Sequence, residues 1–444
     1  PSSFSHILGY IGKLNKEELK EKYAQGYFSA DYIGKTGVEK SYETFLRGTY
    51  GRKRIEVDAN GKMQTTLAEL APVPGAYLEL TIDAAFQQKL EEIIRHYLKE
   101  NNKSRAAAVV LEPQTGQVLA LISLPTFDSN DFSGGIKKEI YEHYSSDINQ
   151  PLFNRVLSGT YPSGSVIKPA IAAAALTEGI INANTSFLST GGLRVGDWFF
   201  PDWQAGGQGI TNLRKALAWS VNTFFYYLGG GYDDFTGLGV EKITFYLKKF
   251  GFSKPLGIDL PAEASGFLPS KDWKESTKKE KWYVGDTYNL SIGQGDLLVT
   301  PLQIAGMTAV FANKGKLLKP KIVKTVIDPI TKEKQNVEPE IILDNFISAE
   351  NLRTVRLGLK DCVDYGSCRR LSALPFAVAG KTGTAQWNKN KPNHAWFTSF
   401  APFDKPEIVV TILVEEGGEG SALAVPIAYD FYKWWWGQRN GIMR

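Results

Sequence analysis

Cysteine and histidine are scarce in this chain of 444 residues, which has two cysteines and four histidines. Two cysteines exclude a disulfide-rich scaffold, and they exclude four cysteine ligands around zinc or an iron–sulfur cluster. So few histidines argue against a histidine-rich metal centre. We therefore expect no metal and no cofactor, and we look for chemistry that depends on other residue types.

The chain also has little net charge and no long apolar run. Its formal net charge of +4 comes from 51 basic and 47 acidic residues and is too small to indicate a nucleic-acid partner. No window approaches the run of about 18 apolar residues typical of a membrane-spanning helix, and the first residues do not resemble a signal peptide. Because the sequence begins without methionine, an anchoring segment left off its N-terminus stays an open alternative.

The hydrophobic fraction, 43% of the residues, is sufficient for a sizeable core, and 444 residues correspond to two or three structural units. Two prolines and a glycine in the run 72–75 interrupt the pattern and indicate a domain boundary. We expect residues 1–75 to form a small, irregular α+β unit and residues 76–444 to form the larger domain.

The larger domain has hairpin patterns near both of its ends. Asp83 and the apolar spacing after it predict a helix through residue 100, and dense β-type runs with a turn between them follow at 106–124. A second such hairpin at 396–415 precedes a last helix at 424–436. This order predicts an α+β fold with one mostly antiparallel sheet built from both ends, helices covering it, and an all-helical insertion between the halves.

The first candidate site is the run 161–169, in which Ser165 and Lys168 stand three residues apart at the start of an alanine-rich helix. At this spacing both side chains project to one side, and the serine lies near the positive end of the helix dipole. The lysine can take the serine proton only if burial or another cation lowers the lysine pKa. Alone, the pair also fits an ordinary helix start with a surface lysine.

Two further short motifs follow along the chain. Ser220 and Asn222 lie in an apolar and aromatic run, which should be buried except where these two side chains face a cavity. The alternative is a structural role, as a helix-capping pair or as buried polar side chains whose hydrogen bonds are made within a helical core. Lys381, Thr382 and Thr384 lie among small residues typical of a strand that another segment approaches, with a cation and two hydroxyls available to a carboxylate. An anion-binding loop without catalytic meaning is the alternative here.

The order of the three motifs is more specific than any one of them. Ser165-x-x-Lys168, Ser220-x-Asn222 and Lys381-Thr382-Gly383 together form the signature set of serine penicilloyl-transferases. The wider runs 161–169, 293–303 and 380–385 resemble the transpeptidase domains of penicillin-binding proteins. The motifs therefore point to a serine acyl-transferase.

The resemblance extends outside that domain. The segments 7–12 and 34–39 are similar to the pedestal of class B penicillin-binding proteins, so the likeness covers nearly all of the chain. Within class B, the runs 282–287 and 291–295 resemble the cell-elongation type, and the division-specific type is the alternative that stays open. The resemblance implies a penicillin-binding, serine β-lactamase-like domain preceded by part of a pedestal.

The resemblance implies a role for each matching residue. Ser165 would attack the D-Ala-D-Ala carbonyl of a peptidoglycan stem peptide and hold an acyl-enzyme until an amine of a neighbouring stem completes the cross-link. Lys168 would be the base, kept neutral partly by the nearby Lys381 cation. Ser220 would relay the proton to the leaving group, and Asn222 would hold a substrate amide.

The third motif would bind the end of the substrate. Lys381, Thr382, Gly383 and Thr384 would hold the terminal carboxylate in this resemblance. The backbone N–H groups of Ser165 and Thr384 would form the oxyanion hole, a feature that contributes several kcal/mol, on the order of 3, in acyl transfer. No histidine is needed for this chemistry.

The resemblance also implies partners and a location. Stem peptides and β-lactams would occupy the site, while a SEDS-family glycosyltransferase and the elongation scaffold would dock on the pedestal. A membrane anchor outside this chain would hold the catalytic domain on the outer side of the inner membrane, in the periplasm. A D,D-carboxypeptidase or β-lactamase of the same fold, and a scaffold or penicillin-binding sensor, are the alternatives. The extra N-terminal unit favours the transpeptidase.

Some relatives of this type bind zinc before the second motif through Asp, His and Cys. Here Asp197 and Asp202 are present, but Gln208 stands where a histidine is expected and no cysteine is near. We therefore predict no structural metal. The two cysteines, Cys362 and Cys368, stand just ahead of the third motif, where a disulfide and two free thiols are equally good alternatives.

Overall fold

A five-stranded antiparallel sheet lies at the centre of the larger domain in the computed structural model, which describes residues 2–441. The strand order is β16-β17-β18-β6-β7. The two halves join where β18 pairs with β6, with Val410 opposite Val110. This confirms the prediction that strands from both ends of the domain form one sheet. The strands are β6 (Ala106–Leu111), β7 (Val118–Leu124), β16 (Ala379–Ala385), β17 (His394–Ala401) and β18 (Ile408–Val414).

Helices cover both faces of this sheet. All residues of β6, β17 and β18 are buried, which is why these strands are continuous apolar runs in the sequence. On one face lie α5 (Ala84–Glu100) and α15 (Ala424–Arg439), and on the other lies α13 (Pro301–Ala312). Trp435 of α15 is buried in this core, and Trp436 stacks on Phe376 at a ring distance of 4.5 Å.

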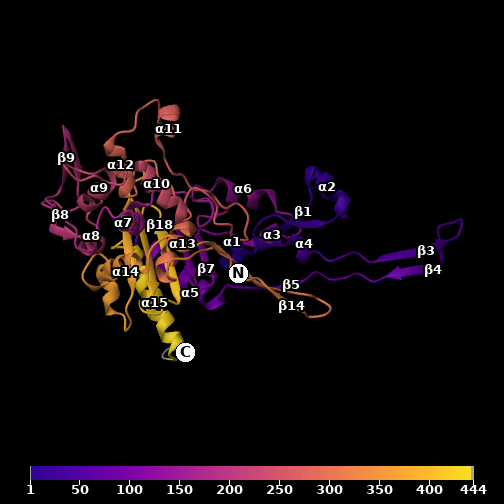
Figure 1. Ribbon diagram of the computed structural model, residues 1–444. Coiled ribbons are helices and arrows are strands. Elements are labelled where there is room, and N and C mark those ends of the chain that lie inside the picture. Colours follow the sequence, from indigo (N-terminus) through magenta and orange to yellow (C-terminus); the bar gives the residue numbers. More distant parts are fainter. Residues whose placement is uncertain (1, 442–444) are drawn as a thin grey trace.

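The middle of the domain is a helical region beside the sheet (Figure 1). In addition to its helices it carries two small two-stranded sheets, in which β8 pairs with β11 and β9 pairs with β10. Its helices are α7 (Lys168–Thr177), α8 (Leu213–Trp219), α9 (Asn222–Gly230), α10 (Gly239–Lys249), α11 (Lys271–Trp273), α12 (Val284–Ser291) and α14 (Ala349–Asp364). Its short strands are β8 (Ser186–Ser189), β9 (Gly192–Val195), β10 (Trp198–Pro201) and β11 (Gly209–Asn212).

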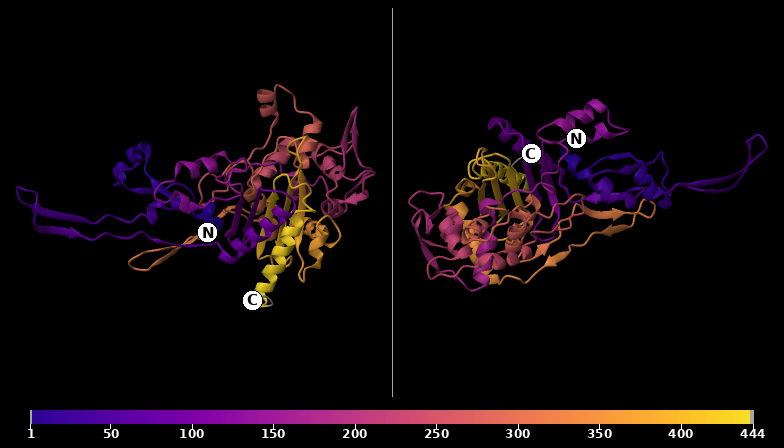
Figure 2. Two further views of the ribbon diagram at one scale, coloured as in Figure 1. Left: turned by 180° about the vertical axis from the view of Figure 1, so that it is seen from behind. Right: turned by 90° about the horizontal axis from the view of Figure 1, so that it is seen from above.

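The N-terminal unit is small and mixed, as expected, and it ends in a long two-stranded ribbon of β3 and β4. Figures 1 and 2 show this ribbon reaching away from the rest of the chain, on the side opposite β8 and β9. Every residue of both strands is exposed. The unit comprises α1 (Ser5–Leu8), β1 (Ile11–Lys13), α2 (Lys16–Lys22), β2 (Tyr32–Gly34), α3 (Gly37–Ser41), α4 (Glu43–Leu46), β3 (Arg52–Val57) and β4 (Met63–Leu70).

The chain enters the larger domain through β5, which pairs with β13 in a separate three-stranded sheet. A division at residue 75 stays a prediction. Within residues 2–441, no helix combines the length and the apolar character needed to cross a bilayer. The remaining elements are β5 (Tyr77–Leu80), α6 (Lys138–Ser146), β12 (Leu317–Leu318), β13 (Val323–Ile327), β14 (Lys334–Asn336) and β15 (Ile341–Leu343).

Candidate active site

Ser165 lies in a 3₁₀ turn, Gly164–Ile167, that runs directly into α7. The sequence predicted an α-helical first turn here, and the tighter turn is a common variant at a helix N-terminus. Gly164 has a φ of 52°, and a Cβ on it would lie 2.8 Å from the carbonyl oxygen of Thr384. Glycine is therefore required to bring the turn that carries Ser165 against β16.

Gly293, part of the run that resembled the family, supports this turn from the other side. Its carbonyl oxygen accepts a hydrogen bond of 2.8 Å from the backbone N–H of Gly164. With a φ of 76°, Gly293 approaches so closely that a Cβ would lie 2.1 Å from the Gly164 oxygen. Any side chain at residue 293 would thus displace the turn that holds Ser165.

Lys168, the first residue of α7, connects the first motif to the second. Its side chain is completely buried, and its Nζ donates hydrogen bonds to Asn222 Oδ1 at 2.7 Å and to the carbonyl oxygen of Ser220 at 2.8 Å. A third contact, to Ser220 Oγ, measures 3.3 Å. Ser220 ends α8 with a φ of 59° and a ψ of 38°, a left-handed conformation that a serine adopts at a cost. Such strain is typical of functional sites.

Burial controls the protonation of the two lysines. Removal from water lowers the pKa of Lys168 to about 7, although the Asp202 carboxylate opposes this shift. Burial, and then the charge of Lys168, lower the pKa of Lys381 well below its usual range. The family resemblance implied that the Lys381 cation helps to keep Lys168 neutral, but burial is the main cause. Lys168 can therefore accept a proton near neutral pH.

β16 presents the third motif to the site as an edge strand. Thr382 and Thr384 line the cavity described below, whereas Lys381 is completely buried and its Nζ donates to the carbonyl oxygen of Thr382 at 3.1 Å. Gly383 is also buried, at the contact between β16 and the turn of Ser165. An edge strand leaves backbone N–H and C=O groups unpaired on its free side, where a peptide can add as a further strand.

The three motifs meet at a cavity of about 310 Å³. Among the hydrogen bonds of residues 2–441, none joins Ser165 Oγ to Lys168, whose side chain is completely buried and does not line the cavity. The cavity continues into a hollow of about 530 Å³ that is rich in carboxamide side chains, including Asn289, Gln386 and Asn393. The cavity itself is lined by Ser165, Trp203, Trp219, Ser220, Asn222, Ile292, Gln294, Ser367, Thr382, Thr384, Glu419 and Ser421.

Asp202, which the sequence analysis considered only in predicting that no zinc is bound here, holds the second motif. Its carboxylate accepts hydrogen bonds from the backbone N–H groups of Asn222 at 2.9 Å and Thr223 at 3.0 Å, and from the Thr223 hydroxyl at 2.8 Å. It thereby caps α9 and fixes the position of Asn222. Over residues 2–441, no three or more His, Cys, Asp or Glu side chains gather as a metal site, and the absence of a metal stays a prediction.

Cys362 and Cys368 form a disulfide, with Cα atoms 5.1 Å apart. The structure thus decides between the two alternatives that the sequence left open. The bridge closes a short loop at the end of α14, and Ser367 of this loop lines the cavity. No short motif marks Ser367, and sequence reasoning missed it.

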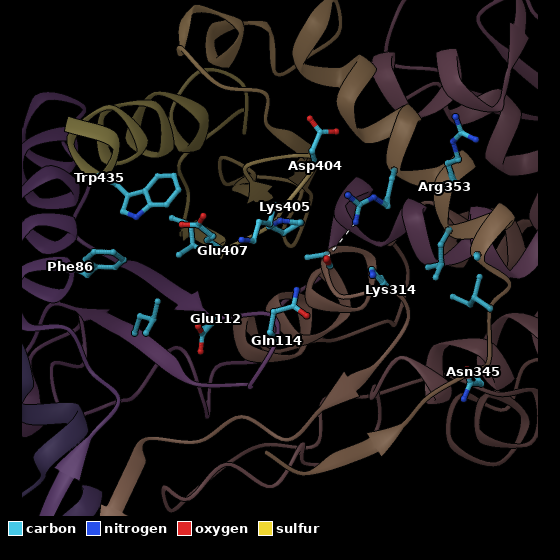
Figure 3. Close-up of a pocket in the computed structure, with 18 residues that line it drawn as sticks. Phe86, Glu112, Gln114, Lys314, Asn345, Arg353, Asp404, Lys405, Glu407 and Trp435 are labelled. Carbon is cyan, nitrogen blue, oxygen red and sulfur yellow. Dashed lines mark hydrogen bonds between the residues drawn. The ribbon is translucent and has the colours of Figure 1, made fainter. Parts of the chain in front are cut away.

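A larger cavity, of about 1030 Å³, lies elsewhere on the domain. Figure 3 shows it between the β17–β18 turn, with Asp404 and Lys405, and the end of α15, with Trp435. Charged side chains of both signs surround it, and none of the three motifs contributes to its lining. Size alone therefore does not indicate the reactive site.

Comparisons with known proteins agree with this geometry. The family profile of the penicillin binding protein transpeptidase domain matches residues 106–433, and that of the penicillin-binding protein dimerisation domain matches residues 1–80. The peptidoglycan D,D-transpeptidase MrdA of Haemophilus influenzae is 33% identical over 98% of this chain and 68% of its own length. MrdA of Acinetobacter baumannii is 34% identical over 97% of this chain and 64% of its own length.

Solved structures give the same result. PBP2 of Pseudomonas aeruginosa, in complex with WCK 5153, superimposes with a TM-score of 0.85 at 34% identity, over 98% of this chain and 88% of that one. PBP2 of Helicobacter pylori, in complex with MreC, has a TM-score of 0.85 at 32% identity, over 98% of this chain and 78% of that one.

The chain therefore belongs to the penicillin-binding protein transpeptidase family. The dimerisation domain ahead of the transpeptidase domain places it in class B. Within that class its likeness is to the PBP2, or MrdA, type of peptidoglycan D,D-transpeptidase. The resemblance and the fold class predicted from the sequence are confirmed.

Proposed function

We propose that Ser165 is the nucleophile with which this chain cross-links peptidoglycan stem peptides during cell-wall elongation. Ser165 Oγ attacks the carbonyl of the D-Ala-D-Ala bond while Lys168 takes its proton, and Ser220 passes that proton to the leaving amine as the C–N bond breaks. The amine of a second stem then attacks the ester and releases Ser165. The observation that carries the proposal is that Lys168 contacts both Ser220 and Asn222 beside the cavity of Ser165.

The binding roles follow from which groups reach the cavity. Asn222 accepts from Lys168 through Oδ1, and one N–H of its amide donates to the carbonyl oxygen of Pro201 at 3.4 Å. The second amide N–H is left to donate to a substrate carbonyl. The hydroxyls of Thr382 and Thr384, with Lys381 beneath and Gly383 between, receive the terminal carboxylate. The backbone N–H groups of Ser165 and Thr384 form the oxyanion hole.

The adduct with penicillin tests this proposal. After incubation with a penicillin, we expect one adduct by intact mass, mapped by peptide analysis to Ser165, because the lactam carbonyl stands in for the D-Ala-D-Ala carbonyl. Ser165→Ala should abolish the adduct. Ser372→Ala, at an exposed serine whose hydroxyl donates to the carbonyl oxygen of Arg369, is the matched control and should keep it.

A penicillin adduct on another residue, or an adduct that persists in Ser165→Ala, would contradict the assignment of Ser165 as the nucleophile. The lifetime of the adduct decides between the transpeptidase and its hydrolytic alternatives. Slow loss supports a transpeptidase, whereas rapid release of penicilloate supports a β-lactamase, in which water resolves the acyl-enzyme. Release of free D-Ala from a stem pentapeptide without cross-linked product would support a carboxypeptidase.

We further propose that residues 1–75 are part of a pedestal that docks elongation proteins, and that residues 76–444 are the transpeptidase domain. A membrane anchor outside this chain would hold both on the periplasmic side of the inner membrane. A relative, H. pylori PBP2, was solved in complex with MreC, and another similar structure is described as a peptidoglycan synthase complex that coordinates polymerization and crosslinking. The β3–β4 ribbon supports this proposal. An isolated two-stranded sheet is only marginally stable, and this one exposes apolar side chains, as surfaces that bind a partner do.

Leu67 on this ribbon, 55% exposed, provides the test. Leu67→Lys should weaken binding of a purified MreC-type protein by about tenfold, because it would bury an unpaired charge in an apolar contact. Penicillin acylation should stay as in the parent chain. Lys62→Ala, in the turn of the same ribbon, is the control for a general effect of substitutions in the ribbon, and it should leave binding unchanged. Unchanged binding to Leu67→Lys, measured by calorimetry, would exclude this ribbon face as the docking surface.

A further inference from the structure

The loop closed by the Cys362–Cys368 disulfide touches the active-site cavity. Both cysteines are completely buried, and the loop begins in the last turn of α14, which contains Cys362. Ser367 contributes to the lining of the cavity that also contains Ser165 and Thr382. The loop is therefore close enough to influence whatever ligand occupies the third motif.

Ser367 and Thr382 form a hydroxyl pair, with their Oγ atoms 2.7 Å apart. Ser367 Oγ also lies 3.3 Å from the sulfur of Cys362, which carries no hydrogen in a disulfide and can only accept. The single Ser367 proton thus has two acceptors in reach, and the Thr382 oxygen is both nearer and a stronger acceptor than the sulfur. When Ser367 donates to Thr382, the proton of Thr382 is free to point into the cavity. A carboxylate only accepts hydrogen bonds, so this is the orientation that it requires.

The loop is held to the second motif as well. The backbone N–H of Ser367 donates to the carbonyl oxygen of Ala218 at 3.1 Å, two residues before Ser220. Just ahead of the loop, Asp361 forms a two-point pair with Arg214 of α8, with both N–O distances at 2.7 Å. The loop thus connects α8, which directly precedes Ser220, to the hydroxyl of Thr382.

We propose that Ser367, held by the Cys362–Cys368 loop, is a positioning residue that turns the hydroxyl of Thr382 toward the carboxylate of the acyl donor. The inference rests on the proposed function, in which Thr382 binds that carboxylate. Ser367 acts through Thr382 and not on the scissile bond. Its effect should therefore depend on whether the donor carries a carboxylate.

A penicillin and its methyl ester separate this role from a structural one, since the ester lacks the charged carboxylate. The formation of the Ser165 adduct, followed by mass over time, gives the second-order acylation rate constant for the penicillin and for its methyl ester. The quantity compared between variants is the ratio of these two constants, the acid-to-ester ratio. Ser367→Ala should lower this ratio about tenfold, the size expected for a hydrogen bond to a charged group. Ser367→Thr, which keeps a hydroxyl, should restore most of it, and Ser372→Ala should leave it unchanged.

The double variant Cys362→Ser/Cys368→Ser tests the loop. Without the bridge, Ser367 loses its fixed position, and the acid-to-ester ratio should again fall, in the same direction as in Ser367→Ala. The ratio is internal to each preparation, so a reduced folded fraction does not change it. An unchanged ratio in Ser367→Ala would overturn the role of Ser367, and an unchanged ratio in the double variant would overturn that of the disulfide. No Ser165 adduct on the parent chain would instead overturn the proposed function, and this inference with it.

Discussion

Replacing Lys168 with methionine is expected to slow the acylation of Ser165 by penicillin about 100- to 10,000-fold, the range of a general base. Methionine has a similar length and tolerates complete burial, so the fold should survive. It cannot accept the serine proton, and it donates no hydrogen bond to Asn222 or Ser220. The measurement is the time course of the Ser165 adduct by mass, with the melting temperature as the check of folding.

The pH dependence of acylation in the parent chain is a second test of Lys168 as the base. Lys168 must be neutral to act as a base, and its pKa is lowered to about 7, so the protonated form dominates below that pH. The acylation rate constant should therefore rise about tenfold per pH unit up to pH near 7 and level above it. Lys319→Met, at a lysine that does not line the cavity and whose side chain is 38% exposed, is the control and should retain the full rate and profile. Acylation by Lys168→Met at the parent rate would exclude Lys168 as the base.

Replacing Glu415 with glutamine is expected to lower the free energy of unfolding by about 3 kcal/mol, because it leaves buried arginine charge without a partner. The Glu415 carboxylate contacts Arg155 at 2.8 Å and Arg105 at 2.7 Å, and it accepts from the Tyr161 hydroxyl at 2.9 Å. Arg155 is only 1% exposed, so water cannot replace the lost charge. Urea unfolding at pH 7 measures the change.

Glu340→Gln is the matched control. Glu340 pairs with Lys319 at 2.7 Å, but its side chain is 63% exposed, so the loss should stay below about 1 kcal/mol. If the two variants unfold at the same urea concentration, the Glu415 network does not hold the fold together. A large difference would show that this network, which includes the Tyr161 hydroxyl, stabilises the fold.

Much of the sheet was predictable because it depends on local patterns. The hairpin at 106–124 and the one near 396–415 follow from apolar runs separated by turn residues, and they appear as β6–β7 and β17–β18. The tight turn of Ser165 was missed, because α-helical and 3₁₀ starts share one sequence pattern. The small sheets of β8–β11 and β9–β10 were missed because strands of four residues carry little periodicity.

The sequence by itself determined the family and the candidate residues, because Ser165 with Lys168, Ser220 with Asn222, and the Lys381 motif are each local spacings in a fixed order. Only the tertiary structure decided how these groups behave. The lowered pKa of Lys168 comes from burial among segments distant in the chain. Likewise, the cap by Asp202, the Cys362–Cys368 bridge and the contact of Ser367 with Thr382 depend on which surfaces the fold brings together. Spacing along a chain carries no information on such contacts. The site therefore depends on the local motifs and on the tertiary contacts together.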